Sequence, residues 1–207
     1  MTKRFAPYDV IICLEAQILG IEPIISRTLE LPRDLNLAQL HEVLQAAFGW
    51  TDRHLHQFIV GGLVIGAPEY LEEDAYGPRV IEATEVHLRD LRFPYGPDAQ
   101  LEILYQYDFG DNWQHRLILS EMPPAAGVKY PRCIAGSRSC PPEDVGGEIG
   151  YEQFLEAWRD PEHEEHADNR RWAGRKFDPE RFDIDDANRA IARALRLSRG
   201  GYRGRLI

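Results

Sequence analysis

Hydrophobic and polar positions alternate most regularly in residues 101–119. Apolar and aromatic side chains take every second position before a short turn, and again after it. The turn residues Gly110, Asp111 and Asn112 tolerate positive φ or bond backbone N–H groups within the turn. Two alternating runs joined in this way predict a β-hairpin with one buried face. The positions that recur at period two are Leu101, Ile103, Tyr105, Tyr107, Trp113, His115, Leu117 and Leu119.

Helical spacing replaces alternation in residues 37–48, where leucines line one side of a predicted helix. Asn36 is a suitable N-cap for this helix and Gly49 a suitable end. Alternating or continuous apolar runs before and after it predict strands. The strands predicted in this part of the chain are 8–17, 24–31, 54–60 and 63–65.

Proline and glycine interrupt the pattern over 123–149, which predicts an irregular, extended segment. Helical spacing then returns, and it ends with a predicted helix over 184–197. We therefore expect an α+β fold in which a mixed, β-grasp-like sheet packs against the 37–48 helix. The expected organisation is one α+β domain over 1–197 (β-rich part 5–122, irregular segment 123–149, helical part 150–197) and a tail over 198–207.

The composition is that of a globular protein with a substantial core, since 43% of the 207 residues are hydrophobic and 10% aromatic. The apolar runs are too short to span a bilayer, and the first residues lead into a strand rather than a signal peptide. Three cysteines do not make a disulfide framework. These features predict a cytoplasmic protein with no membrane partner.

The charge is unevenly distributed. A net charge of −10 argues against non-specific nucleic-acid binding by the body of the protein, yet residues 188–207 contain six arginines and no acid. The tail at 198–207 is rich in arginine and glycine, a composition that binds RNA or single strands. Contact of Arg199, Arg203 and Arg205 with such a polyanion is one interpretation. An exposed tail, or a tail docked on the acidic body, is the other.

Five blocks of sequence carry a resemblance to a known family. They are LAQLHEVLQAAFGW at 37–50, HLHQF at 54–58, YQYDFGDNWQHRL at 105–117, and the segments 130–166 and 177–183. They resemble the plasmid pRiA4b ORF-3-like family, whose members occur on plasmids, next to insertion elements and in bacterial and archaeal chromosomes. The resemblance implies an α+β fold and an association with mobile genetic elements, but no activity.

Acidic residues from two places would meet if the segment 141–149 folds over the hairpin tip. Beside a histidine, such carboxylates hold Mg²⁺ or Mn²⁺ for phosphodiester chemistry, or share protons as an acid–base pair. The alternative is structural: Asp111 closes its turn, and Glu143 and Asp144 cap backbone groups. His115 then bonds one of these carboxylates. The candidate catalytic residues are Asp108, Asp111, His115, Glu143 and Asp144.

Thiolate and imidazole side chains offer a second metal chemistry, because together they suit Zn²⁺. His54 and His56 are two residues apart on a predicted strand and so share a face. Cys133 and Cys140 are seven residues apart, wider than in most structural zinc sites, so inert buried thiols are the alternative. The candidate metal ligands are His54, His56, His115, Cys133 and Cys140.

No motif of an established enzyme class accompanies these residues, and no organic cofactor is predicted. Asp108-Phe109-Gly110 lacks the other kinase motifs, and neither a Walker A sequence nor a G-x-S-x-G elbow occurs. The first hypothesis is a non-enzymatic binding or accessory protein. Its protein or nucleic-acid partner would enter a groove between the hairpin tip at 105–115 and the 130–150 segment. The second hypothesis is a metal-dependent hydrolase or nuclease built from the candidate carboxylates and histidine.

Overall fold

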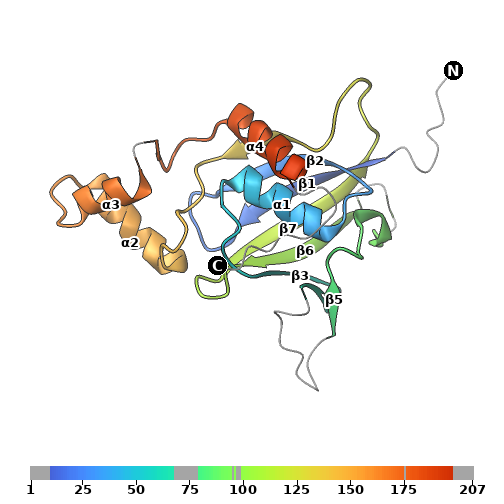
Figure 1. The fold of residues 1–207 in the computed structure, drawn as a ribbon, viewed down its shortest axis with the longest axis horizontal. Coiled ribbons are helices and arrows are strands. Elements are labelled where there is room, and N and C mark those ends of the chain that lie inside the picture. Colours follow the sequence, from blue (N-terminus) through green and yellow to red (C-terminus); the bar gives the residue numbers. More distant parts are fainter. Residues whose placement is uncertain (1–9, 68–78, 95, 97–98, 175, 198–207) are drawn as a thin grey trace.

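An eight-stranded sheet forms the centre of the computed structural model (Figure 1). The structure describes residues 10–67, 79–94, 96, 99–174 and 176–197. The strands are β1 (Ile11–Ile18), β2 (Ser26–Pro32), β3 (His56–Val60), β4 (Leu63–Gly66), β5 (Val80–Glu82), β6 (Gln100–Tyr107), β7 (Trp113–Met122) and β8 (Arg132–Ser137). They lie in the order β5-β4-β3-β6-β7-β1-β2-β8, antiparallel except for β4 and β5. A mixed sheet with separate helices confirms the predicted α+β class, and the narrower β-grasp-like description stays a prediction.

The predicted hairpin is the middle of this sheet. β6 and β7 pair from Gln100 opposite Ser120 to Tyr107 opposite Trp113 at the turn. Alternate side chains of both strands are buried, from Ile103 in β6 to Leu119 in β7, while the residues between them are only partly buried or exposed. The period of two therefore predicted both the strands and their buried face.

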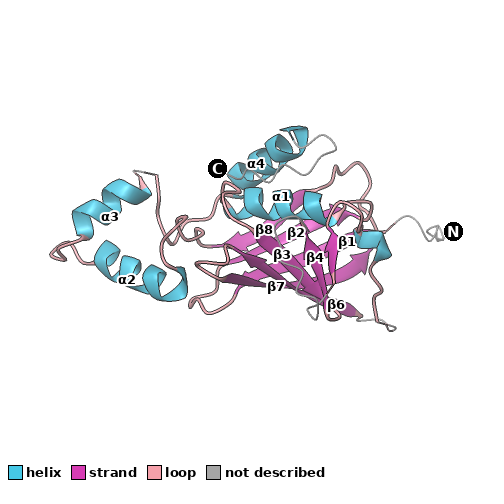
Figure 2. Cartoon of the chain, turned by 60° about the horizontal axis from the view of Figure 1, so that its bottom comes forward, coloured by secondary structure: helices cyan, strands magenta, loops and turns pink. Residues whose placement is uncertain are grey.

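Helix α1 (Leu37–Phe48) lies across one face of the sheet, as its apolar stripe predicts (Figure 2). The side chain of Asn36 accepts a hydrogen bond of 2.8 Å from the backbone N–H of Gln39, and Gln39 Oε1 accepts one of 3.1 Å from the N–H of Asn36. This is a capping box. Gly49 ends the helix in the left-handed conformation, at φ 102°.

The other helices divide into two groups. Helix α4 (Ile184–Leu197) runs beside α1 on the same side of the sheet, where it buries Ala187 and Ile191 (Figure 2). Helices α2 (Gly147–Arg159) and α3 (His166–Ala173) form an arm that projects from the end of the sheet (Figure 1). None of the helices described in the structure is long and apolar enough to cross a membrane.

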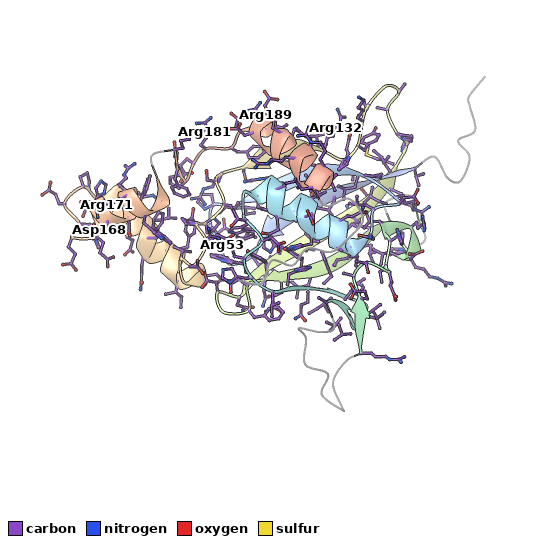
Figure 3. The ribbon with its side chains drawn as sticks, viewed as in Figure 1. Arg53, Arg132, Asp168, Arg171, Arg181 and Arg189 are labelled. Carbon is purple, nitrogen blue, oxygen red and sulfur yellow. The ribbon has the colours of Figure 1, made fainter. Side chains whose placement is uncertain are left out.

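The arm is held by aromatic side chains of α2 and has a charged outer surface. Phe154 and Trp158 are buried, with ring centroids 5.5 Å apart. Trp172 packs its edge on Phe154 but is 51% exposed. At the far end of the arm, Arg171 pairs with Asp168 at 2.8 Å, and both side chains are exposed (Figure 3). An exposed pair of this kind contributes little to stability.

Strand β8 departs from the irregular structure predicted for 123–149. It pairs with β2, and Ser137 lies opposite Ser26, 111 residues earlier in the chain. β8 is an edge strand whose side chains do not alternate between buried and exposed. The local sequence therefore carries no period-two signal, and the strand exists because β2 offers its edge.

Arg27 of β2 fastens the end of α1 to the segment that follows β8. Its buried guanidinium lies over the rings of Phe48 and Phe182, with distances of 5.0 and 4.3 Å to the ring centroids. It also donates hydrogen bonds to four backbone carbonyls. These belong to Ser26, Ala47, Ser137 and Arg138. Carbonyl dipoles thus replace the water that a buried cation loses.

Candidate functional site

Asp108 shapes the hairpin tip. Its backbone has a positive φ of 56°, and its Oδ1 accepts hydrogen bonds from the N–H groups of Gly110 and Asp111, at 3.0 and 3.2 Å. Asp108 therefore closes the turn, whereas the structural alternative predicted from the sequence assigned this role to Asp111. Its other oxygen, Oδ2, lies 3.5 Å from Nε2 of His54.

Asp111 instead holds the 141–149 segment on the tip. Its Oδ2 accepts a hydrogen bond of 3.0 Å from the N–H of Gly146. A Cβ added to Gly147 would lie only 2.5 Å from the carbonyl oxygen of Asp111, so the two backbones touch. The 141–149 segment thus folds over the hairpin tip, which is the condition under which the candidate carboxylates were predicted to meet.

Glu143 joins this segment to the loop after α1. Its Oε1 accepts hydrogen bonds from the backbone N–H and the hydroxyl of Thr51, at 2.8 and 3.1 Å. Tyr107 donates its hydroxyl to Glu143 and accepts a bond from the N–H of Arg53. Burial, together with the charge of Glu143, raises the pKa of Tyr107 far above its ordinary value. The phenol therefore stays a donor, and Glu143 is held in place.

These contacts place three carboxylates around one imidazole, and His54, Asp108 and Asp144 are named here the hairpin-tip cluster. Nε2 of His54 lies 3.1 Å from Asp144, 3.5 Å from Asp108 and 3.9 Å from Glu143. This nitrogen is buried, yet it makes no hydrogen bond of good geometry within the described part of the chain. Asp108 is buried, whereas the side chain of Asp144 is 59% exposed and opens the cluster to solvent.

His56 belongs to another group, although it is two residues from His54. Its ring stacks on that of His41 in α1, with centroids 3.5 Å apart and planes 4° from parallel. Nε2 of His41 lies 2.7 Å from a carboxylate oxygen of Asp52. His41, Asp52 and His56 are named here the inner cluster. Burial lowers the pKa of His56 well below its ordinary value, which keeps the ring neutral.

His115 points into the core and does not join the hairpin-tip cluster. It is fully buried, and its ring lies between 5.1 and 5.2 Å from the rings of Phe48, Trp50 and Tyr105. Its Nδ1 bonds the carbonyl of Trp113 rather than a carboxylate. Burial lowers its pKa to about 3. His115 therefore packs as a neutral core residue.

Neither Cys133 nor Cys140 joins a metal-like group of side chains in the part of the chain that the structure describes. Both are buried, and the thiol of Cys133 donates to the carbonyl of Ala135. Burial raises the pKa of both thiols, that of Cys140 well above its ordinary value. The structure thus does not assemble the thiol–imidazole combination considered for zinc. Arg199, Arg203 and Arg205 lie outside the described residues.

Two residues of the inner cluster, His41 and Asp52, were not among the candidates predicted from the sequence. The signal for His41 was present, because it lies on the stripe of α1 that also buries Leu37, Leu40 and Leu44. A histidine on such a stripe needs a polar partner inside the protein. Asp52 lies in the loop after α1 and has a positive φ of 55°. The conformation of this loop brings its carboxylate to His41. No pattern in the sequence around Asp52 predicts its contact with His41.

Comparison with known proteins gives this fold a family. The family described as plasmid pRiA4b ORF-3-like protein matches residues 11–186. The chain belongs to this family. The uncharacterized protein y4hQ of Sinorhizobium fredii (strain NBRC 101917 / NGR234) is 37% identical over 182 residues, 87% of this chain and 90% of that protein. The crystal structure of MM3350, a protein of unknown function from Methanosarcina mazei Go1, is similar with a TM-score of 0.73 and 38% identity. The match covers 86% of this chain and 98% of that one.

MM3350 shares the fold of this pRiA4b ORF-3-like protein, but the names of the relatives state no activity. Their names state that they are uncharacterized or of unknown function, and the family name alone refers to a plasmid. Any activity must therefore be argued from the geometry of the two clusters.

Proposed function

We propose that this pRiA4b ORF-3-like protein is a divalent-cation-binding accessory protein of plasmids or transposable elements. The cation is held at the hairpin-tip cluster, where the 105–115 hairpin tip meets the 130–150 segment. One observation carries the proposal: the buried Nε2 of His54 faces three carboxylates without a well-formed hydrogen bond. A cation among these groups satisfies the nitrogen and the carboxylates together.

The ligand types fit a particular group of metals. One imidazole with carboxylate oxygens suits Mn²⁺ or Zn²⁺ better than Ca²⁺, which prefers oxygen ligands alone. Asp108 uses Oδ1 for the turn and keeps Oδ2 for an ion, so its position is fixed before the ion arrives. Asp111 and Glu143 supply the outer contacts that orient the ligands.

The bound cation gives an acidic protein a place to hold an anionic partner. The chain carries a net charge of −10 and repels polyanions over most of its surface. Because Asp144 is exposed, an ion beside it keeps coordination positions open to a phosphate or carboxylate of the partner. The partner of such an accessory protein would be another protein or a nucleic acid.

Calorimetric titration of the metal-free protein with MnCl₂ tests this proposal. The wild type is expected to bind Mn²⁺, and His54→Ala and Asp144→Asn are expected to lower the affinity at least tenfold. Asp168→Asn is the matched control, because Asp168 is an exposed carboxylate on the arm (Figure 3). Equal Mn²⁺ affinity in the wild type and both cluster variants would rule out the site.

A metal-dependent hydrolase or nuclease is the second candidate. It is favoured by the carboxylate of Glu143, whose Oε2 lies 3.9 Å from Nε2 of His54, beside the proposed ion, and whose side chain is 15% exposed. Such a carboxylate can act as the general base for a metal-bound water. Mn²⁺-dependent cleavage of bis(4-nitrophenyl) phosphate that is lost in Glu143→Gln would support it. Cleavage no faster than with Mn²⁺ alone leaves the binding role only.

A further inference from the structure

The inner cluster has the composition of a metal site and lies apart from the hairpin tip. One ring nitrogen each from His41 and His56 and one carboxylate oxygen of Asp52 all lie within 4.8 Å of one another. We propose that the inner cluster is a second metal site, which takes a transition metal such as Zn²⁺. Its ligands come from α1, from the loop after α1 and from β3, and none is shared with the hairpin-tip cluster.

Two imidazoles and one carboxylate are a ligand set typical of zinc with an open fourth position. In a tetrahedral site with bonds of about 2.1 Å, ligand atoms are roughly 3.4 Å apart. The separations within the inner cluster are at most 4.8 Å. Because the two imidazoles are stacked with planes 4° from parallel, one ring has to turn out of the stack before both nitrogens face one ion. The hydrogen bond between His41 and Asp52 is the contact that such an ion replaces.

The surroundings of the cluster already orient two of its ligands, His41 and Asp52. Nδ1 of His41 bonds the hydroxyl of Tyr105 at 2.8 Å, which turns Nε2 toward Asp52. Gln45 donates to the same hydroxyl at 3.1 Å, and its Oε1 accepts the backbone N–H of Asp52 at 2.9 Å. Ligating histidines generally have the second ring nitrogen held in this way. Gln45 thus positions two of the three ligands, His41 through the hydroxyl of Tyr105 and Asp52 through its backbone.

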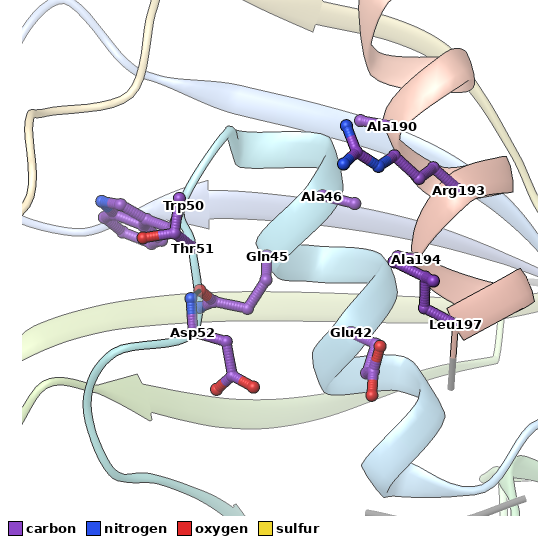
Figure 4. A pocket seen from close by; sticks show the side chains of 10 residues that line it. All are labelled: Glu42, Gln45, Ala46, Trp50, Thr51, Asp52, Ala190, Arg193, Ala194 and Leu197. Atoms are coloured by element: carbon purple, nitrogen blue, oxygen red, sulfur yellow. Dashed lines mark hydrogen bonds between the residues drawn. The ribbon is translucent and has the colours of Figure 1, made fainter. Parts of the chain in front are cut away.

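Access to the inner cluster is from a cavity between α1 and α4. This cavity has a volume of about 390 Å³, within the range of small-molecule sites. Figure 4 shows Asp52 and Gln45 on one wall and Arg193 of α4 on the other. The side chain of Asp52 is 23% exposed, while His41 and His56 are almost fully buried. Asp52 is the one ligand of the three that lines the cavity, so an ion would reach the two histidines past Asp52.

Tyr107 separates the two sites. Its ring centroid lies 6.3 Å from that of His41 and 5.9 Å from that of His54. Because no ligand is common to both clusters, each can be removed without deleting a ligand of the other.

Titration of the metal-free, full-length protein with Co²⁺ tests the second site, because Co²⁺ substitutes for Zn²⁺ and absorbs visible light when bound by imidazole. His56→Phe removes the nitrogens but keeps a ring in the stack, and Asp52→Asn keeps an acceptor for His41. Both variants are expected to lose one bound Co²⁺ and to lower its affinity at least tenfold. The double variant His54→Ala/Asp144→Asn is expected to keep that ion and its visible band.

The results separate this inference from the proposed function. If the hairpin tip binds nothing, the wild type still binds one Co²⁺, which disappears in Asp52→Asn but not in the hairpin-tip variant. An unchanged Co²⁺ stoichiometry and spectrum in Asp52→Asn would overturn the second site. Circular dichroism checks the fold of each variant, and where His56→Phe does not fold, Asp52→Asn alone decides.

Discussion

Asp111 at the hairpin tip accepts a hydrogen bond of 3.0 Å from the backbone N–H of Gly146, 35 residues further along the chain. The bond holds the 141–149 segment over the tip, and with it Glu143 and Asp144. Asp111 itself is not one of the carboxylates that face His54. It is therefore a positioning residue for the hairpin-tip cluster.

Asp111→Ala is expected to weaken Mn²⁺ binding about tenfold, because the loop that carries Asp144 loses its anchor. Asp111→Asn keeps an oxygen that can accept the N–H of Gly146, so it is expected to stay near the wild-type affinity. Calorimetric titration of both variants provides the measurement. Equal losses in the two variants would show that the charge of Asp111 matters, and not its hydrogen bond.

Gly147→Ala is expected to destabilise the protein more than a left-handed backbone alone explains. Its φ is +68°, and an added Cβ would meet the carbonyl oxygen of Asp111 at 2.5 Å. Gly127 is the matched control, with φ +76° and nothing within 4 Å. We expect Gly127→Ala to cost about 1 kcal/mol and Gly147→Ala about 2 kcal/mol more, because backbone must move. Urea unfolding of both variants measures the difference, and equal losses would contradict the close contact.

Arg27→Met is expected to lower the free energy of unfolding by about 4 kcal/mol or more, because it leaves buried carbonyls without donors. Arg116→Met is the matched control. Arg116 pairs with Glu102 at 2.9 Å on the surface, and both side chains are about half exposed. Its loss is expected to stay within about 1 kcal/mol. Similar unfolding curves for the two variants would show that the four carbonyls find other partners.

Acid is expected to destabilise the protein through His115. The folded protein keeps this ring neutral down to a pKa of about 3, whereas the unfolded chain takes up the proton near pH 6.5. Its contribution is therefore complete above pH 6.5 and is lost as the pH falls toward 3. At pH 5 the loss is about 2 kcal/mol.

Unfolding in urea at pH 7.5 and pH 5 measures this effect, with His115→Phe as the comparison. The variant keeps a ring among Phe48, Trp50 and Tyr105 but has no proton to gain. Its stability is expected to fall by about 2 kcal/mol less than that of the wild type over this interval. The same pH dependence in both proteins would mean that His115 is not the group responsible.

The elements that the sequence predicted well are stabilised by neighbours along the chain. Helix α1 has its capping box and its terminating glycine within its own residues, and the β6–β7 hairpin has its turn and its alternation. β8 was missed because its partner β2 lies about 100 residues earlier, and an edge strand leaves no alternating pattern. Patterns among neighbouring residues cannot predict a contact between strands so far apart in the chain.

The same distinction applies to the candidate residues. Asp108, Asp111, Glu143 and Asp144 were grouped from the sequence on the condition that the 141–149 segment folds over the hairpin tip, and the structure places that segment there. His115 was placed with these carboxylates in the prediction, but its alternation with Trp113 and Leu117 puts it on the buried face of β7, where it bonds a backbone carbonyl. The pairing of His41 with Asp52 depends on how α1 lies on the sheet, which no spacing in the sequence encodes.

The strand order also governs when the chain can fold. β1 and β2 are synthesised first, but their outer edges are completed by β7 and β8, which end at residues 122 and 137. A ribosome must therefore reach residue 137 before the β1–β2 hairpin has both of its neighbours. Until then two open strand edges are available to other chains. Products terminated before residue 113 are expected to aggregate, because they lack both strands that cover these edges.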